Sequence, residues 1–198
     1  MNKKRICSFL FAILFCIGCC CMPASAKSLP YRWYKTSIPF KCYFSANQRA
    51  AVTRACGKWS DVRTTNGKQM LSLYVVQDSV TVDNVVKFES GLGFGRVAYC
   101  LPNPEKGELQ AVTIKLESGK KWSVGKAKDC YDIQTIVQHE LGHAIGIAHC
   151  HEASEGSGPC WSATCLKNVM YPIARTNYQN ITLTDYDISS YRLIYQEW

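Results

Sequence analysis

The residues with the clearest chemistry lie in one short stretch, HELGHAIGIAH, at positions 139–149. His139 and His143 are four residues apart, so on a helix both imidazoles lie on one face and can reach a single metal ion. Glu140 is one residue further round, where its carboxylate can take a proton from water beside the ion without being a ligand. The sequence therefore predicts a metal site with a neighbouring general base.

The third ligand is predicted a short distance further along the chain. Gly146 is a poor residue for continuing a helix and has no Cβ to hinder a reversal, so the chain can bring His149 back toward the ion. Three nitrogen ligands leave a fourth position for water, which is the arrangement of a catalytic zinc site. All four histidines lie between positions 139 and 151, which disfavours ordinary surface or core histidines. We therefore expect one catalytic Zn²⁺.

This stretch, when a methionine turn follows it, is the signature of the metzincin metallopeptidases. Here the turn reads NVMYP at residues 168–172, and the whole most resembles the matrixin (matrix metalloproteinase-like) branch, whose turn typically reads Met-Tyr-Pro. The resemblance implies that Met170 packs beneath the ion and is not a ligand. It also implies that Tyr171, Pro172 and the segment 173–182 line the pocket for the substrate residue after the scissile bond.

The resemblance extends over about residues 31–195 and implies an α+β fold, a metzincin-like catalytic domain. Such a domain has a twisted, mixed five-stranded sheet, two long helices and a small C-terminal subdomain that ends in a helix. We accordingly expect residues 27–149 to form an N-terminal subdomain with the sheet and the zinc helix. Residues 150–198 are expected to form the C-terminal subdomain with the methionine turn and the last helix.

Local patterns place the individual elements. Segments rich in β-branched and aromatic residues predict strands, and apolar residues at a spacing of three or four predict helices. Asp129 or Asp132 is expected near the start of the zinc helix, and Thr184 with Asp187 has the spacing of a capping box. The predicted strands are residues 38–44, 71–76, 82–88, 96–100 and 111–116, and the predicted helices are residues 46–61, the zinc helix from about Tyr131, and a last helix from about Leu183.

The strand at residues 96–100 has a special role in this scheme. It follows a glycine-rich loop and is expected to end at Pro102 and Pro104. In matrixins the strand at this place is the sheet edge along which a peptide substrate lies, held by main-chain hydrogen bonds. The alternative is an edge strand that merely ends the sheet. The residues expected to contact the substrate there are Arg96, Val97, Ala98 and Tyr99.

The chain begins with the pattern of a secretory signal peptide. Basic residues at 3–5 precede an apolar run and the small-residue triplet ASA, so cleavage is expected after Ala26 and the protein is expected to be secreted. The apolar run is short for a membrane-spanning helix, and a lipid anchor at Cys19 is a weaker alternative.

The net charge of the chain and its distribution indicate which kinds of partner the protein binds. Removal of residues 1–26 takes away three basic residues and no acidic ones, which lowers the formal charge from +8 to +5. This surplus is spread along the chain, so no nucleic-acid partner is expected. We expect a monomer that binds a protein or peptide substrate. Without a spare histidine cluster or an Asp-rich loop, neither a structural zinc nor calcium is expected.

Cysteines suggest an oxidising compartment. Seven remain after residue 26, and an exported protein with this number is expected to form disulfides and leave one thiol free or paired with another molecule. One bridge is expected among Cys150, Cys160 and Cys165. Cys150 as a zinc ligand is a rival interpretation, disfavoured because His149 completes the ligand set. His151 is expected to be exposed and not a ligand.

These patterns predict a secreted zinc endopeptidase that uses an activated water, with Glu140 as general base. One alternative is a zinc-containing binding protein or toxin-like effector that does not cleave its partner, and the intact Glu140 argues against it. Another is a gluzincin-type peptidase with a distant glutamate as third ligand, against which Gly146 and His149 argue together.

Overall fold

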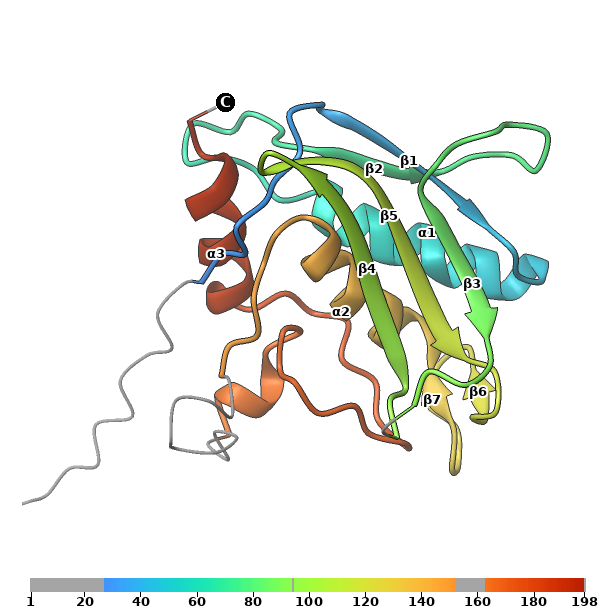
Figure 1. The fold of residues 1–198 in the computed structure, drawn as a ribbon. Coiled ribbons are helices and arrows are strands. Elements are labelled where there is room, and N and C mark those ends of the chain that lie inside the picture. Colours follow the sequence, from blue (N-terminus) through green and yellow to red (C-terminus); the bar gives the residue numbers. More distant parts are fainter. Residues whose placement is uncertain (1–26, 94, 152–162, 198) are drawn as a thin grey trace, which may run out of the picture.

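The computed structural model describes residues 27–93, 95–151 and 163–197, and the predicted signal peptide lies outside these ranges. The backbone is organised around a twisted five-stranded sheet (Figure 1), in the order β2-β1-β3-β5-β4. Neighbouring strands are parallel except for β4, which is antiparallel to β5. The α+β fold with a mixed five-stranded sheet is therefore confirmed. The strands are β1 (Ser37–Cys42), β2 (Ser72–Val75), β3 (Val85–Glu89), β4 (Ala98–Glu105) and β5 (Glu108–Glu117).

The strand β4 forms one edge of the sheet, as expected, but it is longer than predicted. The sequence placed its end at Pro102 and Pro104, whereas the strand continues through both prolines to Glu105. An edge strand has a neighbour on one side only, so a missing N–H is tolerated on its open side. A register irregularity between Asn103 and Pro104 also accommodates the second proline.

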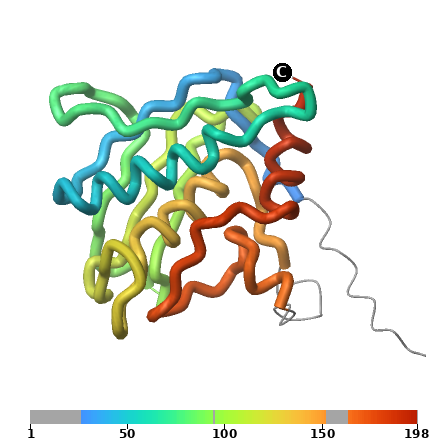
Figure 2. Tube along the Cα trace, turned by 180° about the vertical axis from the view of Figure 1, so that it is seen from behind, coloured from blue at the N-terminus to red at the C-terminus, as the bar shows by residue number. Residues whose placement is uncertain are grey.

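Two helices lie on the same face of the sheet (Figures 1 and 2). The first, α1 (Ala46–Ser60), begins with a capping box formed by Ser45 and Gln48. The second, α2 (Ile133–Ala144), contains the predicted zinc-helix motif. Both bury apolar side chains against the sheet, and the indole N–H of the fully buried Trp59 donates to the Gln138 carbonyl at 2.8 Å. The indole thus joins the end of α1 to the middle of α2.

The helix α2 starts two residues later than predicted. Residues Tyr131–Asp132 form the short strand β7, which pairs in parallel with β6 (Trp122–Ser123). A short strand therefore occupies the two positions at which the helix was predicted to begin. Asp132 is in the extended conformation and caps the helix, because its carboxylate accepts the Thr135 N–H at 3.0 Å.

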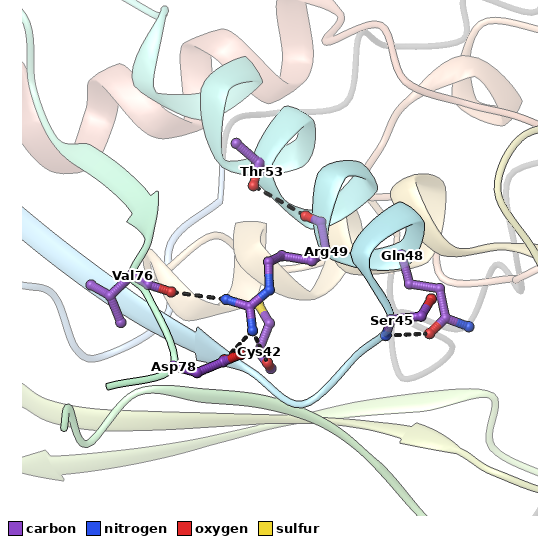
Figure 3. A network of polar contacts seen from close by, with 7 residues as sticks. All are labelled: Cys42, Ser45, Gln48, Arg49, Thr53, Val76 and Asp78. Atoms are coloured by element: carbon purple, nitrogen blue, oxygen red, sulfur yellow. Dashed lines mark hydrogen bonds and ion pairs between the residues drawn. The ribbon is translucent and has the colours of Figure 1, made fainter. Parts of the chain in front are cut away.

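A polar network holds the start of α1 against the sheet (Figure 3). The Arg49 guanidinium donates to the carbonyls of Val76, at 2.9 Å, and Cys42, at 3.1 Å, and pairs with Asp78. Val76 directly follows β2 and Cys42 ends β1. One side chain therefore ties the helix to the ends of two strands.

The chain ends in α3 (Asp185–Tyr195), which packs across the N-terminal segment. The predicted capping box of Thr184 and Asp187 is confirmed. Tyr191 and Tyr195 are buried and accept hydrogen bonds from the Leu71 and Trp33 N–H groups, at 3.1 and 3.0 Å. Before α3 lies the short 3₁₀ helix η2 (Cys165–Lys167). Within the described ranges no helix is both long and apolar enough to cross a membrane.

The described cysteines are mostly free thiols. Cys150 is free and buried, while Cys165 is disulfide-bonded. Cys160 lies outside the described residues, so the bridge expected in this group stays a prediction. The other free cysteines are Cys42, Cys56, Cys100 and Cys130.

Candidate metal centre

The end of α2 shows how the third histidine returns to the helix. Gly146 has a φ of +90°, the left-handed conformation that favours glycine, and its N–H donates to the His143 carbonyl at 2.9 Å. The Ile147 N–H bonds back to the Gly142 carbonyl at 2.9 Å. The chain therefore reverses as soon as the helix ends, and His149 comes to lie beside the two histidines of α2.

The three imidazoles converge closely. The Nε2 atom of His149 lies 3.2 Å from that of His139 and 3.0 Å from that of His143. A zinc ion with tetrahedral bonds of about 2.05 Å places adjacent nitrogen ligands about 3.3 Å apart. Among the residues that the structure describes, these three form the only cluster of potential ligand atoms all within 4.8 Å of one another.

Backbone carbonyls orient two of the rings. The Nδ1–H of His139 donates to the Val169 carbonyl at 2.7 Å, and that of His143 donates to the Ile147 carbonyl at 2.8 Å. These bonds assign the hydrogen to Nδ1 and leave a lone pair on Nε2. Lone pairs facing one another at about 3 Å repel unless a cation lies among them. The donor set therefore fits a metal ion.

Burial favours the neutral, metal-binding form of each ring. Loss of solvent, with the neighbouring imidazole as a second cause, lowers the pKa of His139 to about 4 and that of His143 to about 3. The same two causes lower the pKa of His149 to about 4. All three rings are thus neutral near pH 7 before any metal binds, and no proton has to be displaced.

Glu140 is the buried carboxylate of the site. Its side chain lies in the same cleft as the histidines, which Cys100 of β4 also lines, and it is 7% exposed. Burial raises its pKa to about 8, and the nearby backbone N–H of Cys100 opposes the rise. A cation nearby would lower the pKa again. The carboxylate can therefore exchange a proton near neutral pH, as a general base requires.

The methionine turn lies directly under the helix that carries the ligands. Met170 is fully buried, and a Cβ atom added to Gly142 would overlap its sulfur. Glycine at this point of α2 is therefore what lets the turn approach. The packing of Met170 beneath the ion, which the resemblance to matrixins implies, stays a prediction.

The turn is held by a carboxylate from α3, which the sequence analysis missed. Asp187 accepts the N–H groups of Val169, at 3.0 Å, and Met170, at 3.1 Å. Since the Val169 carbonyl in turn accepts His139 Nδ1–H, Asp187 orients a candidate ligand through the turn. Sequence spacing showed only the capping role of Asp187, and nothing in the local pattern signals the second role.

The site opens into a cleft of about 610 Å³. One wall comes from β4 and the residues before it, and the other from the methionine turn and the segment that follows. Every residue predicted to bind substrate lines this cleft: Arg96, Val97, Ala98, Tyr99, Tyr171 and Pro172. Lining residues that the sequence analysis did not single out are Tyr131, Thr135, Ile136 and Leu166. The first three lie just before the histidine motif, so proximity was the only signal.

Comparison with known proteins agrees with this geometry. Residues 25–196 match the Matrixin family. The chain belongs to this family. It is 26% identical over 138 residues to karilysin of Tannerella forsythia, which covers 62% of this chain and 28% of that protein. It is 25% identical over 164 residues to metalloendoproteinase 1-MMP of Arabidopsis thaliana, covering 76% of this chain and 38% of that protein. For metalloendoproteinase 2-MMP of the same plant the identity is 22% over 164 residues, with 74% and 36% covered.

The resemblance to matrixins inferred from the motifs is therefore confirmed. The family is zinc-dependent, and this matrixin contains the histidine triad. The matched part covers between 28% and 38% of the length of these relatives.

This matrixin departs from the family pattern just after the third histidine, where a serine usually stands. Here the residue is Cys150, whose N–H donates to the Met170 carbonyl at 3.0 Å and whose thiol is outside the ligand cluster. His151 also lies outside the cluster, and it is half-buried although it was expected to be exposed. Its Nδ1 atom has almost no accessible surface, because the surrounding chain covers that edge of the ring.

Proposed function

We propose that this chain is a secreted zinc endopeptidase that hydrolyses peptide bonds of protein substrates. The observation that carries the proposal is the convergence of three Nε2 atoms beside a buried carboxylate in an open cleft. Membership of the matrixin family supports the same activity. The names of the plant relatives are those of metalloendoproteinases. Secretion rests on the signal-peptide pattern of residues 1–26.

The ligands and the base have separate tasks in this proposal. His139, His143 and His149 would hold one Zn²⁺. When bound, this ion would act as a Lewis acid that lowers the pKa of water and polarises the scissile carbonyl. Glu140 accepts a proton from the attacking water and later delivers it to the leaving amine. The Glu140 side chain lines the cleft together with the three histidines.

Substrate binding uses the two walls of the cleft. The open edge of β4 offers main-chain groups from Ala98 onward, so a peptide can add to the sheet as a further strand. Tyr171 and Pro172 face the same cleft and bound the space for the residue after the scissile bond. Main-chain binding accepts many sequences, which suits an enzyme that cleaves proteins.

The proposal is tested with Glu140→Gln. Gln keeps the shape of the side chain but cannot accept a proton, so hydrolysis of casein should fall by about 10²- to 10⁴-fold while zinc stays bound. The measurements are zinc content by atomic absorption and digestion with and without a chelator. His151→Ala is the matched control and should keep both properties. Full activity of Glu140→Gln, or digestion that survives complete removal of metal, would refute the proposal.

A further inference from the structure

The side chains that line the cleft include more basic than acidic groups. Among the described residues, its charged side chains are Glu140, which lies beside the histidines, and the two arginines Arg96 and Arg175. Arg96 stands just before β4, and Arg175 follows the methionine turn. The two guanidinium groups thus come from the two segments that are proposed to hold the substrate. An arginine stays charged at every pH of interest.

Each arginine packs on a tyrosine that also lines the cleft. The Cζ atom of Arg96 lies 5.2 Å from the ring centroid of Tyr99, and that of Arg175 lies 5.7 Å from the ring centroid of Tyr171. Stacking on an aromatic face restrains the guanidinium of Arg175 while its N–H groups remain available to bind a carboxylate. Within the described ranges Arg175 makes no ion pair.

The wall of the cleft that carries Arg175 also contains a buried hydroxyl group, that of Tyr171. Tyr171 is 6% exposed, and its hydroxyl is buried without a hydrogen-bond partner among the described residues. Burying a hydroxyl unpaired is unfavourable, so the Tyr171 ring gains a hydrogen bond if a bound ligand shifts it and supplies an acceptor atom. A carboxylate is such an acceptor and is also the natural partner of Arg175.

The segment that carries Arg175 is anchored by hydrogen bonds to the loop before β7. The Asn177 N–H donates to the Cys130 carbonyl at 3.1 Å, and the Asp129 N–H donates to Asn177 Oδ1 at 2.8 Å. These bonds fasten the segment to the loop before β7, which carries the exposed Lys126, Lys128 and Asp129. The backbone of the segment that carries Arg175 is therefore fixed where it borders the cleft.

From this geometry we propose that the cleft selects peptides with an acidic side chain shortly after the scissile bond. Arg175 is the main specificity-determining residue, and Arg96 is a second one. The inference rests on the proposed function, because it assigns a substrate class to the same site. The same carboxylate chemistry could come from the free C-terminus of a peptide, and the test separates the two sources.

The test uses amidated fluorogenic peptides that differ only by Glu or Gln at each of the first three positions after the scissile bond. For at least one position kcat/KM should be about three- to tenfold higher with Glu at low salt, as for a partly exposed ion pair. The ratio should approach one as ionic strength rises, because salt screens the pair. The Gln peptide is also tested with a free C-terminal carboxylate in place of the amide. If this peptide alone is cleaved faster than the amidated Gln peptide, the cleft binds a chain end, and the proposal is overturned.

Variants connect the preference to the residues. Arg175→Gln should bring the Glu-to-Gln ratio close to one, and Arg96→Gln should lower it less. The matched control is Lys41→Gln, since Lys41 Nζ also lies over a tyrosine, 5.6 Å from the Tyr43 centroid, but outside the cleft. This control should leave the ratio unchanged. A ratio that persists in Arg175→Gln would overturn the assignment.

Binding separates this inference from the proposed function. Zinc-loaded Glu140→Gln should bind the labelled Glu peptide about three- to tenfold more tightly than the Gln peptide, measured by fluorescence anisotropy. Cleavage of both peptides at equal rates with equal affinities would overturn the inference and leave the peptidase proposal intact. If the wild-type protein cleaves neither these peptides nor casein, the peptidase proposal fails, and the ratio of affinities still decides the inference.

Discussion

The helices α2 and α3 meet the same methionine turn but contribute to the site in different ways. α2 supplies two candidate ligands and the candidate base from one local sequence pattern. α3 supplies no ligand, yet its Asp187 holds the turn whose Val169 carbonyl orients His139. The identity of the ligands is therefore a local property of the sequence, whereas their orientation depends on a residue 48 positions from His139.

Asp187 shows why such a contact is effective. It is fully buried, and burial raises its pKa although four hydrogen bonds oppose the rise. The donors are the N–H groups of Val169 and Met170 and the N–H and hydroxyl of Thr184. A carboxylate taken out of water is retained only where donors replace the solvent, so the turn and the helix start constrain one another.

The largest effect is expected for a candidate ligand itself. His149→Ala removes one of three nitrogen donors, so zinc affinity should fall by more than about a hundredfold, beyond the range for outer contacts. Peptide hydrolysis should disappear with the metal. Zinc retained after dialysis against a graded series of chelators measures the affinity. His149→Ala protein that retains zinc as firmly as wild type would remove His149 from the ligand set.

A large loss of stability is expected at the end of α2. Gly146→Ala forces a side chain into the left-handed region, which costs about 1–3 kcal/mol, and its Cβ would lie 2.6 Å from the Tyr31 carbonyl oxygen. The matched control is Gly125→Ala, because Gly125 has a φ of +86° but nothing within 4 Å of an added Cβ. Urea unfolding should show a greater loss for Gly146→Ala. Equal losses would mean that the contact with Tyr31 contributes nothing.

The sequence predicted most of α2 and little of its surroundings. His139, Glu140, His143 and Gly146 were found because helical periodicity and a positive φ are properties of the local chain. The contact of Met170 with Gly142 was implied only by family resemblance, since it joins segments that no local spacing connects. The five strands of the main sheet and the three α-helices were found with small errors at their ends, whereas β6, β7 and η2 were not predicted.

Those errors have physical causes that depend on the tertiary structure. β4 continues through Pro102 because a sheet edge tolerates a missing N–H, and edge position depends on the order of all five strands. α2 begins late because Tyr131 pairs with Trp122 in a two-stranded sheet. The sequence of β4 does not show that it lies at the edge of the sheet, and the sequence around Tyr131 does not show that it pairs with Trp122.

A smaller effect is expected for the positioning residue of α3. Asp187→Asn keeps the size of the side chain but replaces one acceptor oxygen by an amide that faces an N–H donor. The free energy of unfolding should fall by about 1–3 kcal/mol, and zinc affinity should fall by about 10- to 100-fold through the loosened His139. Calorimetry and zinc titration measure these changes.

The control for this prediction comes from the same helix. Asp185→Asn changes an exposed carboxylate in the first turn of α3, two residues away, and should leave zinc affinity unchanged. If Asp187→Asn binds zinc as tightly as Asp185→Asn, then α3 does not orient the site, and the contrast between the two helices is lost.

The smallest effect concerns the pH dependence of the metal-free protein. The folded pKa values of the three site histidines, about 3 to 4, lie below their ordinary value of 6.5. Between these values the unfolded chain binds more protons, so acidification from pH 6.5 to 4.5 should lower the free energy of unfolding. Glu140 and Asp187, whose pKa values are raised, act in the opposite direction because the folded protein keeps their protons.

The three histidines destabilise the folded protein on acidification, and the two carboxyl groups oppose them. Because the histidines outnumber the carboxyl groups, we expect a net loss of stability. Urea midpoints of chelator-treated protein at pH 4.5, 5.5 and 6.5 measure it. Glu140→Gln should make the loss steeper, since it removes one opposing carboxyl group from α2, and Asp187→Asn should do the same from α3. His149→Ala should make the loss shallower. A wild-type midpoint that rises on acidification would show that the carboxyl groups, and not the histidines, dominate the titration of this site.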